Sequence, residues 1–176
     1  MAMVGLFWIV EGDVYVGAKP SGHAPGVRLT SEGVVGLGDG QSGLHLWEDV
    51  RALTVGGVPV TSLMRQVGAV AEVALVTVKE LALPMGMGPE VEAPPLMTVC
   101  VDAADGEYEL GAYAAAAVGY TQTEADLSRA LLSRLTEGAA TMQTTLAAMS
   151  EWGRAWEGGS APRKAEREEL LRGWLG

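Results

Sequence analysis

The residues of this chain that could take part in binding or catalysis begin with a glycine-rich segment. Gly38 to Gly43 matches the G-x-G-x-x-G pattern, in which backbone amides at the start of a helix bind a pyrophosphate. The residues that follow, 44–55, alternate between apolar and polar side chains as a strand does. This context predicts a flexible loop leading into a strand, and no nucleotide cofactor.

Histidine offers a second possible chemistry. His45 and Asp49 are four residues apart, which on a helix would pair a base with its orienting carboxylate, but on a strand they do not meet in this way. Only one other histidine, His23, is present, so a metal site would need carboxylates from scattered loops. We therefore predict no catalytic residue, no metal site and no enzymatic activity.

Four carboxylates lie between residues 102 and 109, and a lone cysteine, Cys100, precedes them. Such carboxylates could attract Ca²⁺, but they lack the ligand spacing of a known calcium loop, so a solvated turn is predicted. Cys100 lies in the apolar segment 96–101 with no base beside it in sequence. We interpret it as an inert core residue.

Composition narrows the possible partners. The 176 residues carry a formal net charge of −10, which opposes binding to nucleic acid or to anionic membranes. One cysteine cannot form an internal disulfide. The first apolar run has no basic residue before it and stops at Glu11, which argues against a secretory signal. A cytoplasmic protein is the simplest interpretation.

The first two thirds of the chain are expected to be rich in β-structure. Short apolar, β-branched segments are separated by glycine-containing turns, which is typical of hairpins. The predicted strands are 6–10, 14–17, 27–30, 34–37, 44–55 and 73–78, followed by a hairpin of 96–101 and 107–110.

The strand 44–55 carries four predicted core residues, Leu44, Leu46, Val50 and Leu53, whose phase slips near Glu48 and Asp49. The slip predicts a bulge or a short turn there. The segment 83–95, rich in Pro, Gly and Met, is expected to be a mobile loop.

Helices are expected at the end of the chain. Thr121 and Glu124 have the spacing of a capping box, and leucines then recur every four residues, so a helix is predicted from about 123 to 137, ending at Gly138. Further amphipathic helices are predicted over 139–156 and from Pro162 to Leu175.

This order of elements, with the strand motif Leu46-Trp-Glu-Asp-Val50, resembles bacterial pleckstrin-homology-like (PH-like) domains over residues 4–135. The resemblance implies an α+β fold: an antiparallel split β-barrel capped by a helix, with Trp47 in the core and Asp49 at the strand break. Two short C-terminal helices would follow. Domain boundaries are expected at 1–138 for the shell and its capping helix, and at 139–176 for a helical extension.

Lipid-binding members of that family have basic residues in the loop between the first two strands, whereas the corresponding loop here is Glu11-Gly12-Asp13. The resemblance therefore implies the family's other role, a non-catalytic module that binds a protein or peptide. An alternative is a small-ligand-binding protein or enzyme with a pocket near the 83–95 loop.

Three tryptophans, Trp152, Trp156 and Trp174, follow the predicted capping helix. Tryptophan is costly to expose and is enriched at interfaces. We interpret these residues as a possible partner-binding surface. The tail could dock on its own domain, on a second copy in a homo-oligomer or on another protein.

Overall fold

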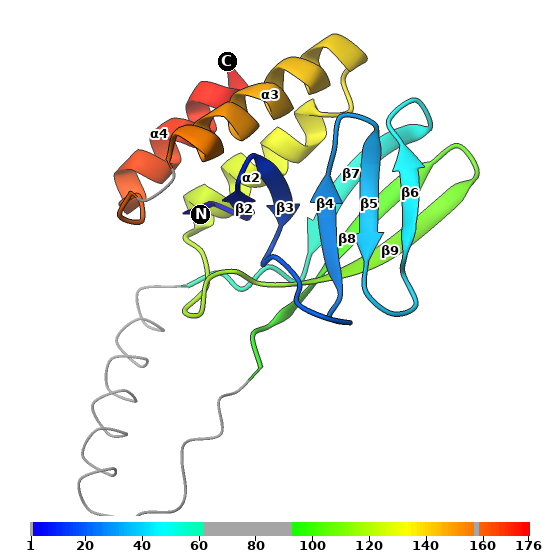
Figure 1. Ribbon diagram of the computed structural model, residues 1–176, viewed down its shortest axis with the longest axis horizontal. Helices are drawn as coiled ribbons and strands as arrows, with labels where there is room; N and C mark the ends of the chain where they lie inside the picture. The colour runs from blue at the N-terminus through cyan, green and yellow to red at the C-terminus, as the bar shows by residue number, and fades with distance from the viewer. Residues whose placement is uncertain (1, 62–92, 157–158) are drawn as a thin grey trace, which may run out of the picture.

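The computed structural model describes residues 2–61, 93–156 and 159–176. Within these ranges the protein is α+β, with two antiparallel sheets and three helices (Figure 1). The six-stranded sheet contains, in spatial and chain order, β1 (Ala2–Val4), β2 (Phe7–Val10), β3 (Asp13–Val16), β4 (Gly26–Leu29), β5 (Gly33–Leu37) and β6 (Gly43–Leu46). The three-stranded sheet contains β7 (Val50–Gly56), β8 (Leu96–Ala103) and β9 (Gly106–Tyr113). The helices are α2 (Gln122–Arg134), α3 (Ala139–Ala155) and α4 (Lys164–Leu175).

Tight turns form the start of the first sheet. The predicted hairpin at 11–13 is confirmed: Glu11 and Gly12 connect β2 to β3, with φ of +55° and +88°. Two consecutive positive φ values suit the right-handed twist of paired strands. The strand β1 was not predicted, because the turn that separates it from β2 contains only Gly5, at φ +56°, and the buried Leu6.

The prediction of a single strand over 44–55 is wrong, but the short turn predicted near Glu48 and Asp49 is confirmed. The segment forms two strands in different sheets, β6 and β7, and the phase slip marks the turn 47–49 between them. Val50 and Leu53 are buried as expected, but Leu44 and Leu46 are 46% and 38% exposed. These two leucines lie on β6, the edge strand of the first sheet, where little packs against their side chains. Trp47 is half-buried against the core, and its indole N–H donates to the Thr30 carbonyl at 2.7 Å.

Residues 38–42 of the glycine-rich segment connect β5 to β6, and Gly43 begins β6, so the prediction of a loop before a strand is confirmed. Gln41 gives this turn a structural role. Its amide Nε2 donates to the carbonyls of Leu37 and Gly111 at 2.9 Å, and its Oε1 accepts the Gly111 N–H at 2.7 Å. Gly111 belongs to β9 of the second sheet, so the Gln41 side chain connects the two sheets by hydrogen bonds.

The predicted hairpin of 96–101 and 107–110 is confirmed as β8 and β9, with Ala104 and Asp105 as its turn and Gly106, at φ +153°, directly after it. The capping box that starts α2 is also confirmed: Thr121 Oγ1 accepts the Glu124 N–H at 3.2 Å, and Glu124 Oε2 accepts the Thr121 N–H at 3.2 Å. The helix ends earlier than predicted, at Arg134, and Gly138 is instead the N-cap of α3.

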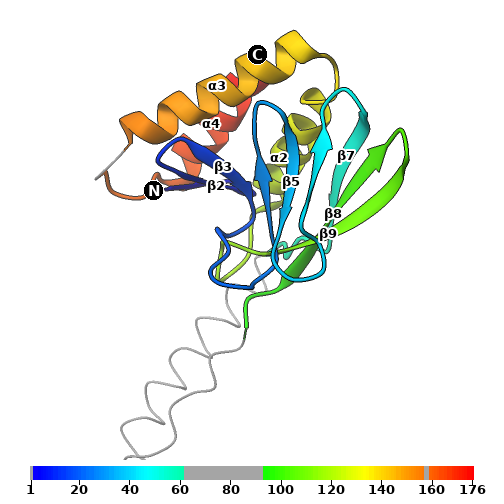
Figure 2. The same ribbon diagram turned by 45° about the vertical axis from the view of Figure 1, so that its right-hand side comes forward.

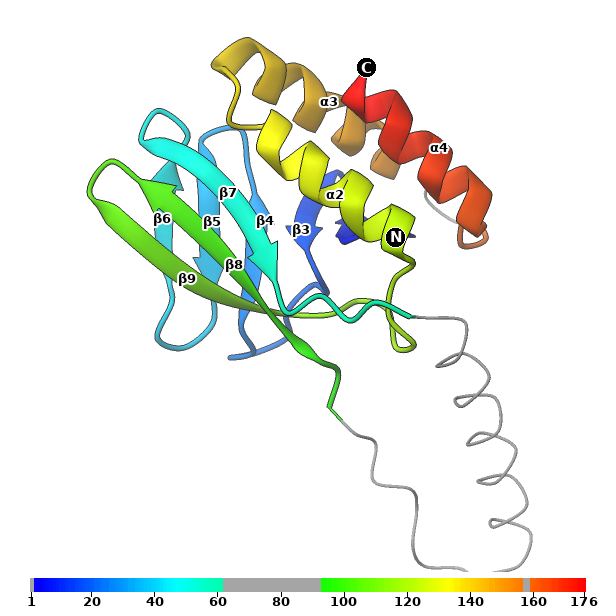
Figure 3. The same cartoon turned by 180° about the vertical axis from the view of Figure 1, so that it is seen from behind.

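The two C-terminal helices dock on the same chain. Helix α3 lies over β2 and β3 (Figure 2), where Gly153 allows close approach of Ile9. Helix α4 packs on α2 and β1, and α2 lies between α4 and β7 (Figure 3). Pro162 was predicted to begin the last helix. It instead precedes Arg163, the N-cap of α4, and so lies outside the helix. Buried residues from both sheets and all three helices form one hydrophobic cluster.

Two predicted elements, the strand 73–78 and most of the loop 83–95, lie outside the described residues. In the described part of the chain, no helix combines the length and the apolar character needed to cross a bilayer.

Candidate functional site

Three tryptophans from two helices meet on one side of the molecule. Trp152 on α3 and Trp156, the C-cap of α3, are one turn apart and stack at a centroid distance of 5.2 Å. Trp174 of α4 meets Trp152 edge to face at 5.8 Å. All three side chains are partly exposed, so the folded chain does not remove them fully from water.

Neighbouring residues hold this aromatic cluster in place. Met149, one turn before Trp152 on α3, is buried in the core, and so is Leu171, one turn before Trp174 on α4. Trp152 and Trp174 themselves pack against the core, while the Trp156 indole N–H donates to the Ser160 carbonyl at 3.1 Å. The helix faces that anchor α3 and α4 therefore also fix the orientation of the tryptophans.

The cluster lines a groove between α3 and α4 with a volume of about 460 Å³. Pro162, Leu170 and Gly173 complete its apolar surface, and the carboxylates of Glu166 and Glu169 lie along it. The volume is within the range of about 300–1,000 Å³ that is typical of ligand pockets. We call this feature the tryptophan groove.

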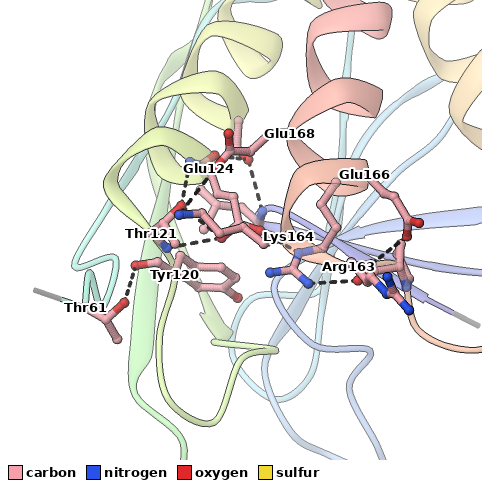
Figure 4. Close-up of polar contacts among 12 residues, drawn as sticks. Thr61, Tyr120, Thr121, Glu124, Arg163, Lys164, Glu166 and Glu168 are labelled. Atoms are coloured by element: carbon pink, nitrogen blue, oxygen red, sulfur yellow. Dashed lines mark hydrogen bonds and ion pairs between the residues drawn. The ribbon is translucent and has the colours of Figure 1, made fainter. Parts of the chain in front are cut away.

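An ion pair holds α4, and with it one wall of the tryptophan groove, on α2. The Glu124 side chain is 2% exposed, and its Oε1 accepts a hydrogen bond from Arg167 Nε at 2.5 Å. Arg167 Nη1 also donates to the Pro162 carbonyl at 2.9 Å. Figure 4 shows Glu124 reaching from the start of α2 towards the first turn of α4, where Glu166 Oε2 accepts the Arg163 N–H at 2.7 Å.

Buried polar groups also tie α2 to the first sheet and to the chain before it. Ser128 Oγ accepts the Leu6 N–H at 3.1 Å and donates to the Glu124 carbonyl at 2.7 Å. Tyr120, which precedes α2, is 1% exposed, and its phenol oxygen accepts the Ala115 N–H at 2.8 Å. Burial raises the pKa of Tyr120 above its ordinary value. These contacts are structural, because they are satisfied within the chain and lie away from the groove.

The histidines do not meet at a common site. His23 Nδ1 lies 3.1 Å from Asp39 Oδ1 at the surface, with both side chains more than 80% exposed. His45 contacts the Tyr108 ring at a centroid distance of 4.4 Å and not Asp49. Among the described residues, no group of three His, Cys, Asp or Glu side chains is arranged to hold a metal ion.

The hairpin carboxylates lie at the surface as predicted. The phenol group of Tyr108 donates a hydrogen bond of 2.8 Å to Asp105, and this bond raises the pKa of Tyr108.

The prediction that Cys100 is a core residue is wrong, because its side chain is only half-buried. On β8 the residues on either side of it, Val99 and Val101, point to the core, so Cys100 points to the opposite face of the sheet.

The sequence pointed to the three tryptophans as a binding surface, but not to the other residues of the groove. Pro162 was interpreted only as a helix start, and Glu166 and Glu169 were not singled out. The spacing of Glu166, Glu169 and Leu170 with Trp174 on one helix could have placed them on neighbouring faces. The spacing along one helix could not show how far α4 lies from Trp152 and Trp156.

Comparison with family models, with curated proteins and with solved structures finds no match to this chain. The function must therefore be inferred from its own residues.

Proposed function

We propose that the protein is a non-catalytic interaction module that binds a protein or peptide partner in the tryptophan groove. The observation that carries this proposal is the cluster of three partly exposed tryptophans around one groove. Aromatic residues in partly desolvated pockets dominate binding energy at protein interfaces. A groove between two helices also suits an extended or helical segment of a partner.

The PH-like resemblance supports the same proposal. We take the two sheets with α2 as a split barrel of that type, because Gln41 joins them at β9 and α2 packs against β7. In lipid-binding members the loop between the first two strands is basic. The segment that the resemblance matched to that loop, residues 11–13, follows the second strand of the structure and not the first, because β1 precedes β2. It carries Glu11 in the β2–β3 turn and Asp13 at the start of β3, 3.7 Å from Arg28. This arrangement favours a protein partner in the cytoplasm over an anionic lipid surface.

The alternative, a small-ligand pocket near the 83–95 loop, involves residues that are mostly outside the described ranges, and no specific observation favours it. A second copy of this chain is the other candidate partner. The experiment below separates it from a different protein.

The test is affinity capture from the native cell with three versions of the full-length protein: the wild type, Trp156→Ala and Trp8→Ala. Trp156 lies at the outer end of the aromatic cluster, so its removal alters the groove with little effect on the core. Trp8, half-buried on β2 and not part of the groove, is the matched control. Melting temperatures show whether each variant is folded.

A partner of the groove is captured by the wild type and by Trp8→Ala but lost with Trp156→Ala. The purified partner should then bind the wild type at least tenfold more tightly than Trp156→Ala in calorimetry. Light scattering of the protein alone detects a homo-oligomer. If every captured protein is retained by a folded Trp156→Ala variant, the groove is not the binding surface.

A further inference from the structure

We infer that the tryptophan groove binds an arginine side chain of a protein partner, which lies against the exposed indole surfaces and pairs with the carboxylates of Glu166 and Glu169. This inference rests on the proposed function and adds the chemistry of the segment that is bound. It follows from the combination of aromatic and acidic groups in one groove.

The charge of the groove is the first argument. Among the described residues that line it, two are acidic and none is basic. Glu169 is exposed, and no ion pair to it is formed within the described residues. Glu166 uses one carboxylate oxygen, Oε2, to accept the Arg163 N–H, which leaves Oε1 for a ligand. The formal net charge of −10 adds a long-range attraction for cations.

The aromatic rings give the second argument. Cations bind over the face of an indole ring, and tryptophan is the best aromatic partner for them. Trp156 stacks on Trp152 with an interplanar angle of 23°, while Trp174 is turned by 75° to Trp152. The groove thus presents indole surfaces in two orientations, with carboxylates beside them on α4.

Arginine fits this combination better than lysine. Its planar guanidinium group stacks on aromatic faces, is only weakly hydrated and offers a fork of N–H donors that matches a carboxylate. Pro162 and Leu170 supply apolar surface for the aliphatic part of the side chain. A protein segment is the proposed source, because the groove runs between two helices and can contact the residues on both sides of the arginine.

The test uses the full-length protein labelled with ¹⁵N and four capped tripeptides, Gly-Xaa-Gly, in which Xaa is arginine, citrulline, lysine or norleucine. The indole N–H signals of Trp152, Trp156 and Trp174, assigned with single Trp→Phe variants, report binding at the groove. Citrulline keeps the shape of arginine but has no charge, so it isolates the contribution of the cation. Tetramethylammonium tests for a small-molecule cation.

We expect the arginine peptide to shift the three indole signals in a saturable way and to bind about fivefold to tenfold more tightly than the citrulline peptide, as a cation–π contact with a carboxylate nearby implies. Lysine should fall between them. Glu169→Gln should weaken arginine binding several-fold, and Glu166→Gln should do the same while preserving the acceptor for the Arg163 N–H. Glu151→Gln, an exposed carboxylate on α3 outside the groove, makes the same charge change and should leave binding unaltered.

Equal shifts with the arginine and citrulline peptides would overturn the inference. An equal loss of binding in Glu151→Gln and Glu169→Gln would also overturn it, because the electrostatic field of the whole protein would then explain the binding. Tighter binding of tetramethylammonium than of the arginine peptide would assign the groove to a small cation. If the peptides fail while capture of a partner still depends on Trp156, the proposed function stands and only the arginine anchor is wrong. Failure of both experiments removes both proposals.

Discussion

Glu124 on α2 and Arg167 on α4 form an ion pair across 43 residues of sequence, with Oε1 and Nε 2.5 Å apart. Glu124 also completes the capping box of its own helix. One buried carboxylate thus starts α2 and anchors α4, so the tryptophan groove depends on a residue that lies outside it.

The first prediction concerns this ion pair. Arg167→Met keeps much of the aliphatic stem but leaves the Glu124 carboxylate buried without a charged partner. Breaking a buried pair costs about 3–5 kcal/mol, and because 19% of the Arg167 side chain is exposed we expect about 3 kcal/mol. Urea denaturation measures the loss of unfolding free energy.

The matched control is Arg172→Met, which removes a surface pair with Glu168 and should cost less than about 1 kcal/mol. Adding Glu124→Gln to Arg167→Met should restore part of the stability, because the neutral amide needs no counter-charge and can still accept the Thr121 N–H. Equal losses for Arg167→Met and Arg172→Met would contradict the structural role of the pair.

The second prediction compares two helical glycines. Alanine favours a helix over glycine by about 1 kcal/mol, so Gly173→Ala, whose added Cβ would meet no atom within 4 Å, should raise the melting temperature. At Gly153 the Cβ would overlap the Ile9 side chain. Overpacking of this kind costs about 1–3 kcal/mol and should outweigh the helical gain. A stabilising Gly153→Ala would show that α3 does not approach β2 this closely.

The third prediction concerns the turn between β2 and β3. Glu11 has φ +55°, a conformation that costs an ordinary L-residue about 1–2 kcal/mol and that asparagine tolerates better. Glu11→Asn should therefore raise the unfolding free energy by about 0.5–1 kcal/mol. Glu11→Gln removes the same charge without relieving the backbone, so it serves as the control. An equal rise in unfolding free energy in both variants would show that the lost charge, and not the backbone of the turn, is responsible.

The fourth prediction is a dependence of stability on alkaline pH. Burial raises the pKa of Tyr120 above 10.0 in the folded protein, so the folded state holds this proton more tightly than the unfolded chain does. Stability from this group is complete below pH 10.0 and is lost as the pH rises further towards the folded-state pKa. Urea denaturation at intervals from pH 8 to pH 11 should show that fall.

Tyr120→Phe should reduce that alkaline fall. At neutral pH it should also cost about 1–3 kcal/mol, because the Ala115 N–H loses its acceptor. The control is Tyr113→Phe, a change of a half-buried tyrosine on β9. Its unfolding free energy should depend on pH in the same way as that of the wild type. If Tyr120→Phe keeps the full alkaline fall, other groups are responsible for it.

Local signals in the sequence were enough to predict the helices and most hairpins. The capping box of Thr121 and Glu124, the turn at Gly106 and the i, i+4 spacing of Trp152 and Trp156 involve residues close together in the chain, so their geometry follows from backbone conformation alone. The charge of the β2–β3 turn could be read in the same way.

Tertiary packing decided the rest. Alternation in 44–55 shows which side chains share a face but not which face is covered, so Leu44 and Leu46 were assigned to the core although β6 is an edge strand. Trp174 reaches Trp152 only because Arg167 and Leu171 hold α4 in place. The tryptophans were visible in the sequence, but the groove exists only where two distant helices meet, and no local pattern encodes the distance between them.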